Sequence, residues 1–277
     1  MKKLIVGLLV LVLVMASLVG CSSAPSEEVT KVEDLAGKNI GSIVWFGITD
    51  DALLEIFSTG YGTEFAAAKS FDSESALIMG LDTGKIDAAW LRDFQANAYA
   101  KDTEKYFMFS SDTDKMVQGS ARMAAAADTA AANDLVKINA AIAQLQQDGT
   151  LAQLQKDYVD DFEFSSNFES VVMPKIDGAP TYKVSISGSM VPLDYIAADG
   201  NPTGFSIALL AKLSEIAKLN FELVTIGFGA DRIELTSKKI DYIFCYTLTD
   251  KDMEKETDIV FSEPYFSYAG SAFLVKK

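Results

Sequence analysis

The chemistry open to this chain of 277 residues is restricted first by what it lacks, because it contains no histidine. Serine and cysteine triads need a histidine base, and histidine-ligated metal sites need imidazole, so these chemistries are excluded. The chain also has no P-loop, no dinucleotide-binding glycine fingerprint and no nucleophile elbow. These absences exclude those reaction classes, and no metal or cofactor is expected.

The first cysteine, Cys21, lies at the end of a targeting pattern. A basic N-terminus is followed by an apolar run over residues 4–15 and then by small residues, as in a secretory signal. Residues 18–21 (LVGC) resemble a bacterial lipobox, in which the chain is cleaved before the cysteine and its sulfur is lipidated. We predict a signal peptide over residues 1–20 and a lipidated tether over residues 21–30. The alternative is a permanent membrane anchor, but the run is shorter than the roughly 20 residues that a spanning helix needs.

The second cysteine, Cys245, lies in the apolar run 242–246. A buried and inert thiol is the usual state of such a residue. With Cys21 lipidated, Cys245 has no partner cysteine, so no disulfide is expected.

Composition and charge narrow the possible partners. The formal net charge is −15 and 49% of the residues are hydrophobic, which is enough for a substantial core. A basic face that would neutralise phosphates is not expected, so nucleic acid is excluded as a partner. The length indicates one or two domains.

Strands alternate with helices along the chain, which predicts an α/β fold with mostly parallel sheets. Helices are expected over residues 50–57, 73–82, 93–100, 206–218 and 232–237, and strands over 38–46, 86–91, 182–187, 221–226 and 240–246. The alanine-rich stretch 123–147 has apolar residues at helical spacing. Residues 162–180 hold two prolines and several small polar residues, as a linker does.

A local similarity points to two lobes. Residues 81–87 (LDTGKID) are echoed by residues 235–241 (LTSKKID), and both lead into an apolar strand. Two half-chains of similar plan predict two lobes that face each other, and the cleft between them is a usual site for a small molecule.

Two segments carry a resemblance to one family. Residues 182–277 resemble the opening half of the type 2 periplasmic solute-binding proteins of the amino-acid-binding family, through the stretches 192–195 (PLDY), 198–205 (ADGNPTGF) and 261–265 (FSEPY). Residues 32–160 resemble the closing half, through the stretches 34–41 (DLAGKNIG), 84–88 (GKIDA) and 148–151 (DGTL). The resemblance implies a two-lobed fold with the ligand held in the cleft between the lobes.

The two halves stand in reversed order, which predicts a circular permutation. The expected domains are a second lobe over residues 31–122, helices returning to the first lobe over 123–161, a permutation linker over 162–180 and the first lobe over 181–277. The new chain ends would then fall at one crossover between the lobes, leaving one connection missing. Natural termini often lie close together, so permutation is tolerated. The alternative is a fusion of two unrelated fragments or a truncated tandem.

The resemblance also implies where ligand groups would bind. Family members hold an amino acid with an arginine on its carboxylate and an acid on its ammonium, one from each lobe. Asp93 resembles the ammonium-binding acid, although Arg92 lies nearer the expected register, and Asp93 fits a helix N-cap equally well. The arginine has no counterpart, since its place falls near Asp252 or Lys255. Lys251 or Lys255 could replace it, unless both are solvated surface lysines.

Aromatic and small polar residues complete the expected cleft. The turn around residues 47–49 resembles the family's carboxylate-binding turn, and its amides begin the next helix. Trp45 and Tyr246 are as consistent with core packing as with ligand contact, and core packing is favoured for Trp90. A larger or less polar solute, including an aromatic one, suits these residues. We expect the ligand to contact Trp45, Gly47, Thr49, Arg92, Asp93, Met190, Tyr246, Thr247 and Thr249.

The prediction is a monomeric, lipid-anchored, extracytoplasmic solute-binding protein that delivers a small molecule to an ABC permease in the membrane. A sensor domain of the same fold is the first alternative. An enzyme on this fold is the second, and it would need an acid–base pair in the cleft.

Overall fold

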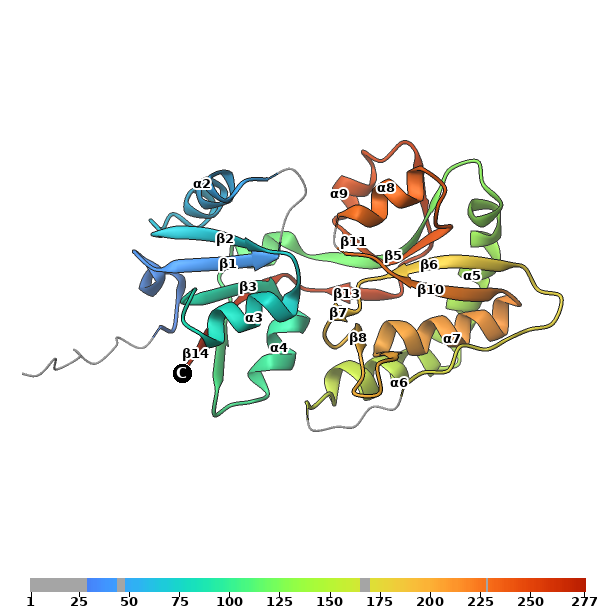
Figure 1. Cartoon of the computed structure of the whole chain (residues 1–277), viewed down its shortest axis with the longest axis horizontal. Helices are drawn as coiled ribbons and strands as arrows, with labels where there is room; N and C mark the ends of the chain where they lie inside the picture. The colour runs from blue at the N-terminus through green and yellow to red at the C-terminus, as the bar shows by residue number, and fades with distance from the viewer. Residues whose placement is uncertain (1–28, 44–47, 165–169, 228) are drawn as a thin grey trace, which may run out of the picture.

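The computed structural model describes residues 29–43, 48–164, 170–227 and 229–277. These residues form two α/β lobes side by side, with long strands running between them through the middle of the molecule (Figure 1). The predicted two-lobed α/β fold class is confirmed. The expectation of mostly parallel sheets is wrong, because antiparallel pairings of β5 (Gly119–Ala126) and β14 (Ser271–Lys276) join the parallel strands of each lobe into mixed sheets.

The second lobe is built on a five-stranded sheet in the order β2-β1-β3-β14-β4. The first three strands are parallel, and β14 runs antiparallel to both of its neighbours. Leu77, Ile78 and Leu81 are buried along one helix, as their spacing predicts. The strands are β1 (Asn39–Ile43), β2 (Ala67–Phe71), β3 (Ala88–Arg92), β4 (Tyr106–Phe109) and β14 (Ser271–Lys276), and the helices are η1 (Val32–Leu35), α2 (Asp50–Tyr61), α3 (Glu74–Asp82) and α4 (Asp93–Ala100).

The first lobe is built on a sheet in the order β10-β6-β11-β5-β12, with β13 also paired to β5. Helices α5 and α7 pack together over one face of this sheet, and their apolar sides are buried there. The strands are β5 (Gly119–Ala126), β6 (Thr181–Ile186), β10 (Asn220–Thr225), β11 (Tyr242–Leu248), β12 (Ile259–Phe261) and β13 (Phe266–Tyr268). The helices are α5 (Ala130–Gln147), α6 (Thr150–Gln155), η3 (Lys156–Asp160), α7 (Phe205–Ala217), α8 (Ala230–Thr236) and α9 (Asp250–Met253).

A small three-stranded sheet projects from the first lobe. It consists of β7 (Ser189–Met190), β8 (Asp194–Ile196) and β9 (Pro202–Thr203), all antiparallel. The predicted turn at Asp199 and Gly200 connects β8 to β9, and Gly200 has the positive φ of 84° that such a turn requires. This sheet brings β7 next to α3 of the second lobe.

Several helix starts follow from single side chains. The hydroxyl oxygens of Thr49, Ser73 and Thr129 each accept a hydrogen bond from the backbone N–H three residues later. These N-caps satisfy backbone donors that a helix would otherwise leave unpaired. The starts of α2, α3 and α5 are therefore encoded locally.

Two covalent segments cross between the lobes. Residues 110–118, which include η2 (Asp114–Val117), connect β4 to β5, and Ala269 and Gly270 connect β13 to β14. The expectation that one crossover would be missing is wrong. The C-terminal strand β14 continues past the crossover and pairs with β3 and β4, so the chain ends inside the second lobe.

Two of the expected segment boundaries also need correction. Residues 119–126 form β5 of the first lobe, so the second lobe does not extend to residue 122 and the alanine-rich segment begins as a strand. Residues 271–276 belong to the second lobe and not to the first. The alanines of β5 lie between β11 and β12, where both faces of the strand are buried, and this packing overrides their helix propensity.

The two crossing segments touch each other closely. A Cβ on Gly270 would lie 2.4 Å from the carbonyl oxygen of Asp114, so only glycine fits there. The Asp114 side chain is buried and its Oδ1 accepts from the Tyr61 hydroxyl at 2.5 Å, the Trp90 indole at 3.1 Å and the Ser271 hydroxyl at 2.6 Å. One carboxylate thus ties three elements of the second lobe to the crossover.

Candidate functional site

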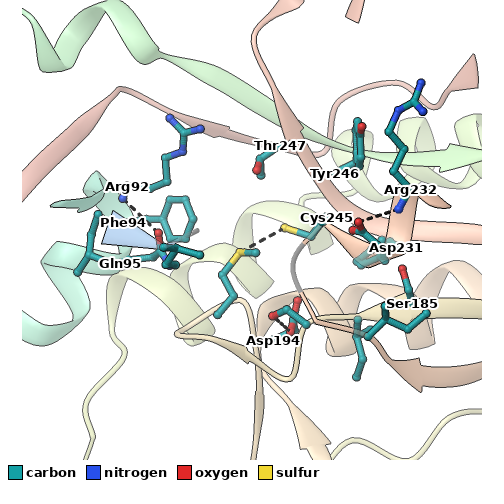
Figure 2. A pocket seen from close by; sticks show the side chains of 18 of the residues that line it. Arg92, Phe94, Gln95, Ser185, Asp194, Asp231, Arg232, Cys245, Tyr246 and Thr247 are labelled. Atoms are coloured by element: carbon teal, nitrogen blue, oxygen red, sulfur yellow. Dashed lines mark hydrogen bonds between the residues drawn. The ribbon is translucent and has the colours of Figure 1, made fainter. Parts of the chain in front are cut away.

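A cavity of about 550 Å³ lies between the two lobes, a volume suited to a small organic molecule. The second lobe contributes residues of β1, β3 and the start of α4. The first lobe contributes the end of β6, the β7–β8 hairpin, the start of α8 and the middle of β11 (Figure 2). Apolar or aromatic side chains make up about half of this lining, and polar or charged side chains make up most of the rest.

The structure brings together five of the residues that the sequence analysis predicts at the ligand. Arg92 reaches the cavity from the second lobe, and Met190, Tyr246, Thr247 and Thr249 reach it from the first. Predictions for Trp45, Gly47 and the lipidated Cys21 lie outside the described residues.

Two predicted residues, Asp93 and Thr49, do not line this cavity. Asp93 is the first residue of α4, where its Oδ1 accepts from its neighbour Phe94 N–H and its Oδ2 accepts from Ala269 N–H, both at 2.8 Å. Both oxygens therefore accept hydrogen bonds from the backbone, one of them at the crossover, and the ammonium-binding role stays a prediction. Thr49 instead caps α2 through Ala52 N–H at 3.3 Å.

Arg92 is the cation that the second lobe presents to the cavity. Its guanidinium carbon lies 4.8 Å from the centroid of the Tyr268 ring and 5.7 Å from that of Trp90. Contact with ring faces stabilises a cation that is partly removed from water. The backbone N–H of Arg92 donates to Gln95 Oε1 at 3.1 Å, which fixes the entry into α4.

Trp90, for which core packing is expected, and Tyr246, whose assignment is open, both pack against neighbours and line the cavity. Trp90 is buried in the core, where its indole N–H donates to the Tyr61 hydroxyl at 2.7 Å, and it also lines the cavity. Tyr246 is half-buried, stacks on Phe261 at 5.7 Å between centroids and lines the cavity as well.

Neither lysine reaches the cavity from the place of the family arginine. Lys255 is exposed, and its ammonium lies 2.6 Å from Asp252 Oδ1. Lys251 is exposed and is not part of the lining. Asp252 faces the cavity, and the hydrogen bonds from Lys255 and Thr249 hold the pKa of its carboxyl below the ordinary value.

The first lobe presents two carboxyl groups that sequence reasoning missed as site residues. Asp194 is buried, and its Oδ1 accepts from the Ser187 hydroxyl and from Gly188 N–H, each at 2.6 Å. Burial raises its pKa to about 7. Asp231 lies at the start of α8, where its Oδ1 accepts from Arg232 N–H at 2.8 Å, and burial raises its pKa as well.

Cys245 reaches the cavity because β11 is irregular. Its φ is 59°, and the pairing of β11 with β5 shifts register between Ile243 and Tyr246. The thiol is buried 4.0 Å from Met190 Sδ, and burial raises its pKa above the ordinary value. The thiol is thus protonated and of low reactivity, in line with the expected buried, inert group.

One buried carboxyl group connects the lobes beside the cavity. Glu74 on α3 accepts from Val191 N–H of the first lobe at 3.2 Å and from the Tyr99 hydroxyl at 2.9 Å. Gln95, which lines the cavity, also donates to it. Burial raises the pKa of Glu74 to about 8.

The missed residues leave weak signals in the sequence. Asp194 lies in the PLDY stretch that carries the resemblance, but no local pattern shows that its hairpin packs against α3 of the second lobe beside the cavity. Asp231 follows a glycine-rich turn and starts a short helix, a position where an acid is common without any ligand.

Two family comparisons agree with this architecture. The sequence model of bacterial extracellular solute-binding proteins, family 3, matches residues 182–277. The model described as NMT1/THI5 like matches residues 8–150, just over half of the chain. The chain belongs to the type 2 periplasmic binding proteins. No curated protein sequence matches it significantly.

Solved structures with a similar fold have low sequence identity to the chain. An ancestral arginine-binding protein bound to arginine is 12% identical with a TM-score of 0.41, covering 88% of this chain and 86% of its own. A probable amino-acid ABC transporter extracellular-binding protein from Bacillus subtilis is 12% identical, with a TM-score of 0.41 and coverage of 86% and 83%. The chain spans 37% of the Bordetella pertussis BvgS periplasmic domain, which is 11% identical with a TM-score of 0.42.

Proposed function

We propose that the protein captures a small organic solute between its lobes and delivers it to an ABC permease. The observation that carries this proposal is the cavity of about 550 Å³ whose walls come from both lobes. A solute that contacts both walls stabilises the closed arrangement, because it binds that arrangement better than the open one. The family membership supports a binding role and an extracytoplasmic location.

Lipid attachment at Cys21 is part of this proposal. The lipobox-like stretch and the short apolar run before it support it. Within the described ranges, the structure contains no helix long and apolar enough to cross a membrane. Mass spectrometry of the protein isolated from bacterial membranes tests the attachment. Lipid attachment predicts cleavage before Cys21 and acyl groups on the new N-terminal residue. An unmodified cysteine would overturn it.

Solute capture is tested by a thermal-shift screen of residues 22–277 against amino acids, aromatic acids, amines, peptides and sugars. A ligand at about 100 times its Kd adds roughly 2.7 kcal/mol to the free energy of unfolding. A saturable rise in Tm supports the proposal when Thr247→Trp, which fills the cavity, melts normally but loses the response. A rise that survives in Thr247→Trp would place the binding elsewhere.

The transport role is tested separately from binding. The loaded protein should stimulate ATP hydrolysis by an ABC permease from the same organism, reconstituted in vesicles. Binding without such stimulation would favour the sensor alternative.

A further inference from the structure

One segment of the first lobe lies against the second lobe outside the cavity. This bridging segment, residues 156–164, consists of η3 and the residues that follow it. Figure 1 shows α4 on the side of the second lobe that is turned toward α6, from which the bridging segment continues. Its contacts with α4 therefore join the lobes at a place separate from the two covalent crossovers.

The first of these contacts is made by Lys101, the residue at the end of α4. Its ammonium donates to the carbonyl oxygen of Val159 at 3.4 Å and also to that of Asp160. Both carbonyls belong to the last turn of η3. A helix leaves its final carbonyl groups without partners inside the helix, and a cation at that end is favourable. A side chain of the second lobe thus caps a helix of the first.

The second contact is aromatic. The Phe164 ring lies 5.0 Å from the Tyr99 ring of α4, measured between centroids. Phe164 also packs at 5.0 Å against Phe162, which is buried and contacts the Tyr195 ring of β8 at 6.0 Å. The contact is therefore anchored in the first lobe. Because Phe164 is 53% exposed, its removal should disturb little besides these ring contacts.

Tyr99 links the bridging segment to the edge of the cavity. Its hydroxyl donates to Glu74 Oε1 at 2.9 Å, and the same oxygen accepts from Val191 N–H of the first lobe at 3.2 Å. Gln95, which lines the cavity, donates to the other oxygen of Glu74. Neither the bridging segment nor its two partners at α4 belong to the lining. These interlobe contacts therefore adjoin the cavity without needing a solute to form them.

We propose that the bridging segment is a latch that holds the lobes in the closed arrangement independently of the solute. The inference builds on the proposed function, because lobe closure is the step that captures a solute. A larger closed fraction lowers the apparent Kd of a solute that binds the closed arrangement. The latch therefore regulates the affinity of the cavity from outside it.

Pulsed electron paramagnetic resonance on residues 22–277 without added solute measures the closed fraction. Nitroxide labels are attached through Met79→Cys on α3 and Ile196→Cys on β8, at two exposed residues on opposite sides of the lobe boundary. Because β7 pairs with β8 and contacts α3, the distance between the labels grows when the lobes separate. The Cys245 thiol is buried and of low reactivity, so labelling is confined to the two introduced cysteines.

The latch is removed by combining Lys101→Met with Phe164→Ser. We expect a second population at longer distance and a fall of about tenfold in the ratio of closed to open molecules, because a charged hydrogen bond and an aromatic contact are lost. The matched control combines Lys105→Met with Phe107→Ser, the same chemical changes at side chains whose contacts lie within the second lobe. The control should leave the distance distribution unchanged. Melting curves establish that each variant is folded.

The outcomes separate this inference from the proposed function. A latch variant with the same distance distribution as the wild type, or with the same shift as the control, would overturn the latch. A wild-type chain that is mostly open without solute would overturn it as well. If the double variant does not melt cooperatively, Lys101→Met alone should give a smaller shift in the same direction. Solute capture is judged only by the thermal-shift screen, so either idea can fail without the other.

Discussion

Asp87 and Asp241 make the same paired hydrogen bonds at equivalent positions of the two lobes. Oδ2 of Asp87 accepts from Asn39 N–H, and Oδ2 of Asp241 accepts from Lys183 N–H, both at 2.8 Å. Each aspartate also donates its own N–H to the carbonyl of the same residue, at 2.7 Å and 2.9 Å. The local similarity in the sequence therefore marks a repeated helix-to-strand connection.

These two aspartates should contribute similar stability. Asp87→Ala and Asp241→Ala are each expected to lower the free energy of unfolding by about 1–2 kcal/mol, because a strand N–H loses a charged acceptor. Urea unfolding measures the change in the free energy of unfolding. Asp72→Ala is the control, because Asp72 is exposed and makes no hydrogen bond to a described residue. Effects as small as that of the control would contradict the equivalence.

The same connection contains a difference that can be engineered. Gly84 has a φ of 71°, and Lys238 at the equivalent position has a φ of 60°, where a side chain is unfavourable. Lys238→Gly is expected to raise the free energy of unfolding by up to about 1 kcal/mol, and Gly84→Ala to lower it by about 1 kcal/mol. Nothing lies within 4 Å of a Cβ on Gly84, so the loss of stability in Gly84→Ala would report backbone strain alone. A loss in both variants would contradict this explanation.

Asp114 should be among the most sensitive positions for stability. Asp114→Ala removes the acceptor from the buried donors of Tyr61, Trp90 and Ser271, so we expect a loss of at least about 3 kcal/mol. Tyr61→Phe removes one of these bonds and should cost about 1 kcal/mol. Chemical denaturation compares the two, and a similar small loss in both would show that Asp114 does not organise the crossover.

Stability should fall as pH rises toward 8. Burial raises the pKa of Glu74 to about 8 and that of Asp194 to about 7, so the folded state binds protons more strongly than the unfolded chain. Their stabilisation is complete below the unfolded pKa values near 4 and is lost as pH rises through the folded values. Glu74→Gln should flatten the decline between about pH 4.5 and 8, measured by Tm across pH, with exposed Glu222→Gln as the control. An unchanged profile would contradict the contribution of Glu74.

The circular permutation is a proposal that can be reversed by design. Val29 and Val275 pack in the same apolar cluster, which supports joining the chain ends. A variant with a short Gly/Ser link from Lys277 to Val29, opened between Asp177 and Gly178, should melt cooperatively and respond to the same ligand as the original chain in the thermal-shift screen. Failure of this variant to fold, with the original chain intact under the same conditions, would favour the fusion of unrelated fragments.

Local patterns in the sequence determined most of the elements. Helical spacing predicts α2, α3 and α7, because their apolar faces are encoded within a few residues. Capping hydroxyls at Thr49 and Ser73 begin the first two of these helices. The repeated stretch that ends at Asp87 and at Asp241 is also a local pattern, and it predicts the two-lobed plan. The absence of histidine limits the chemistry without any structure.

Only the tertiary structure determines where the chain crosses between the lobes and which charged residues face the cavity. The strand at the start of the alanine-rich segment exists because its neighbours in the sheet bury both of its faces. Asp93 Oδ2 accepts from Ala269 N–H, 176 residues away in the chain, a contact that no local pattern predicts. Arg92 and Asp231 face one cavity because two sheets are held together at Gly270 and Asp114, a contact between distant residues that no local pattern encodes.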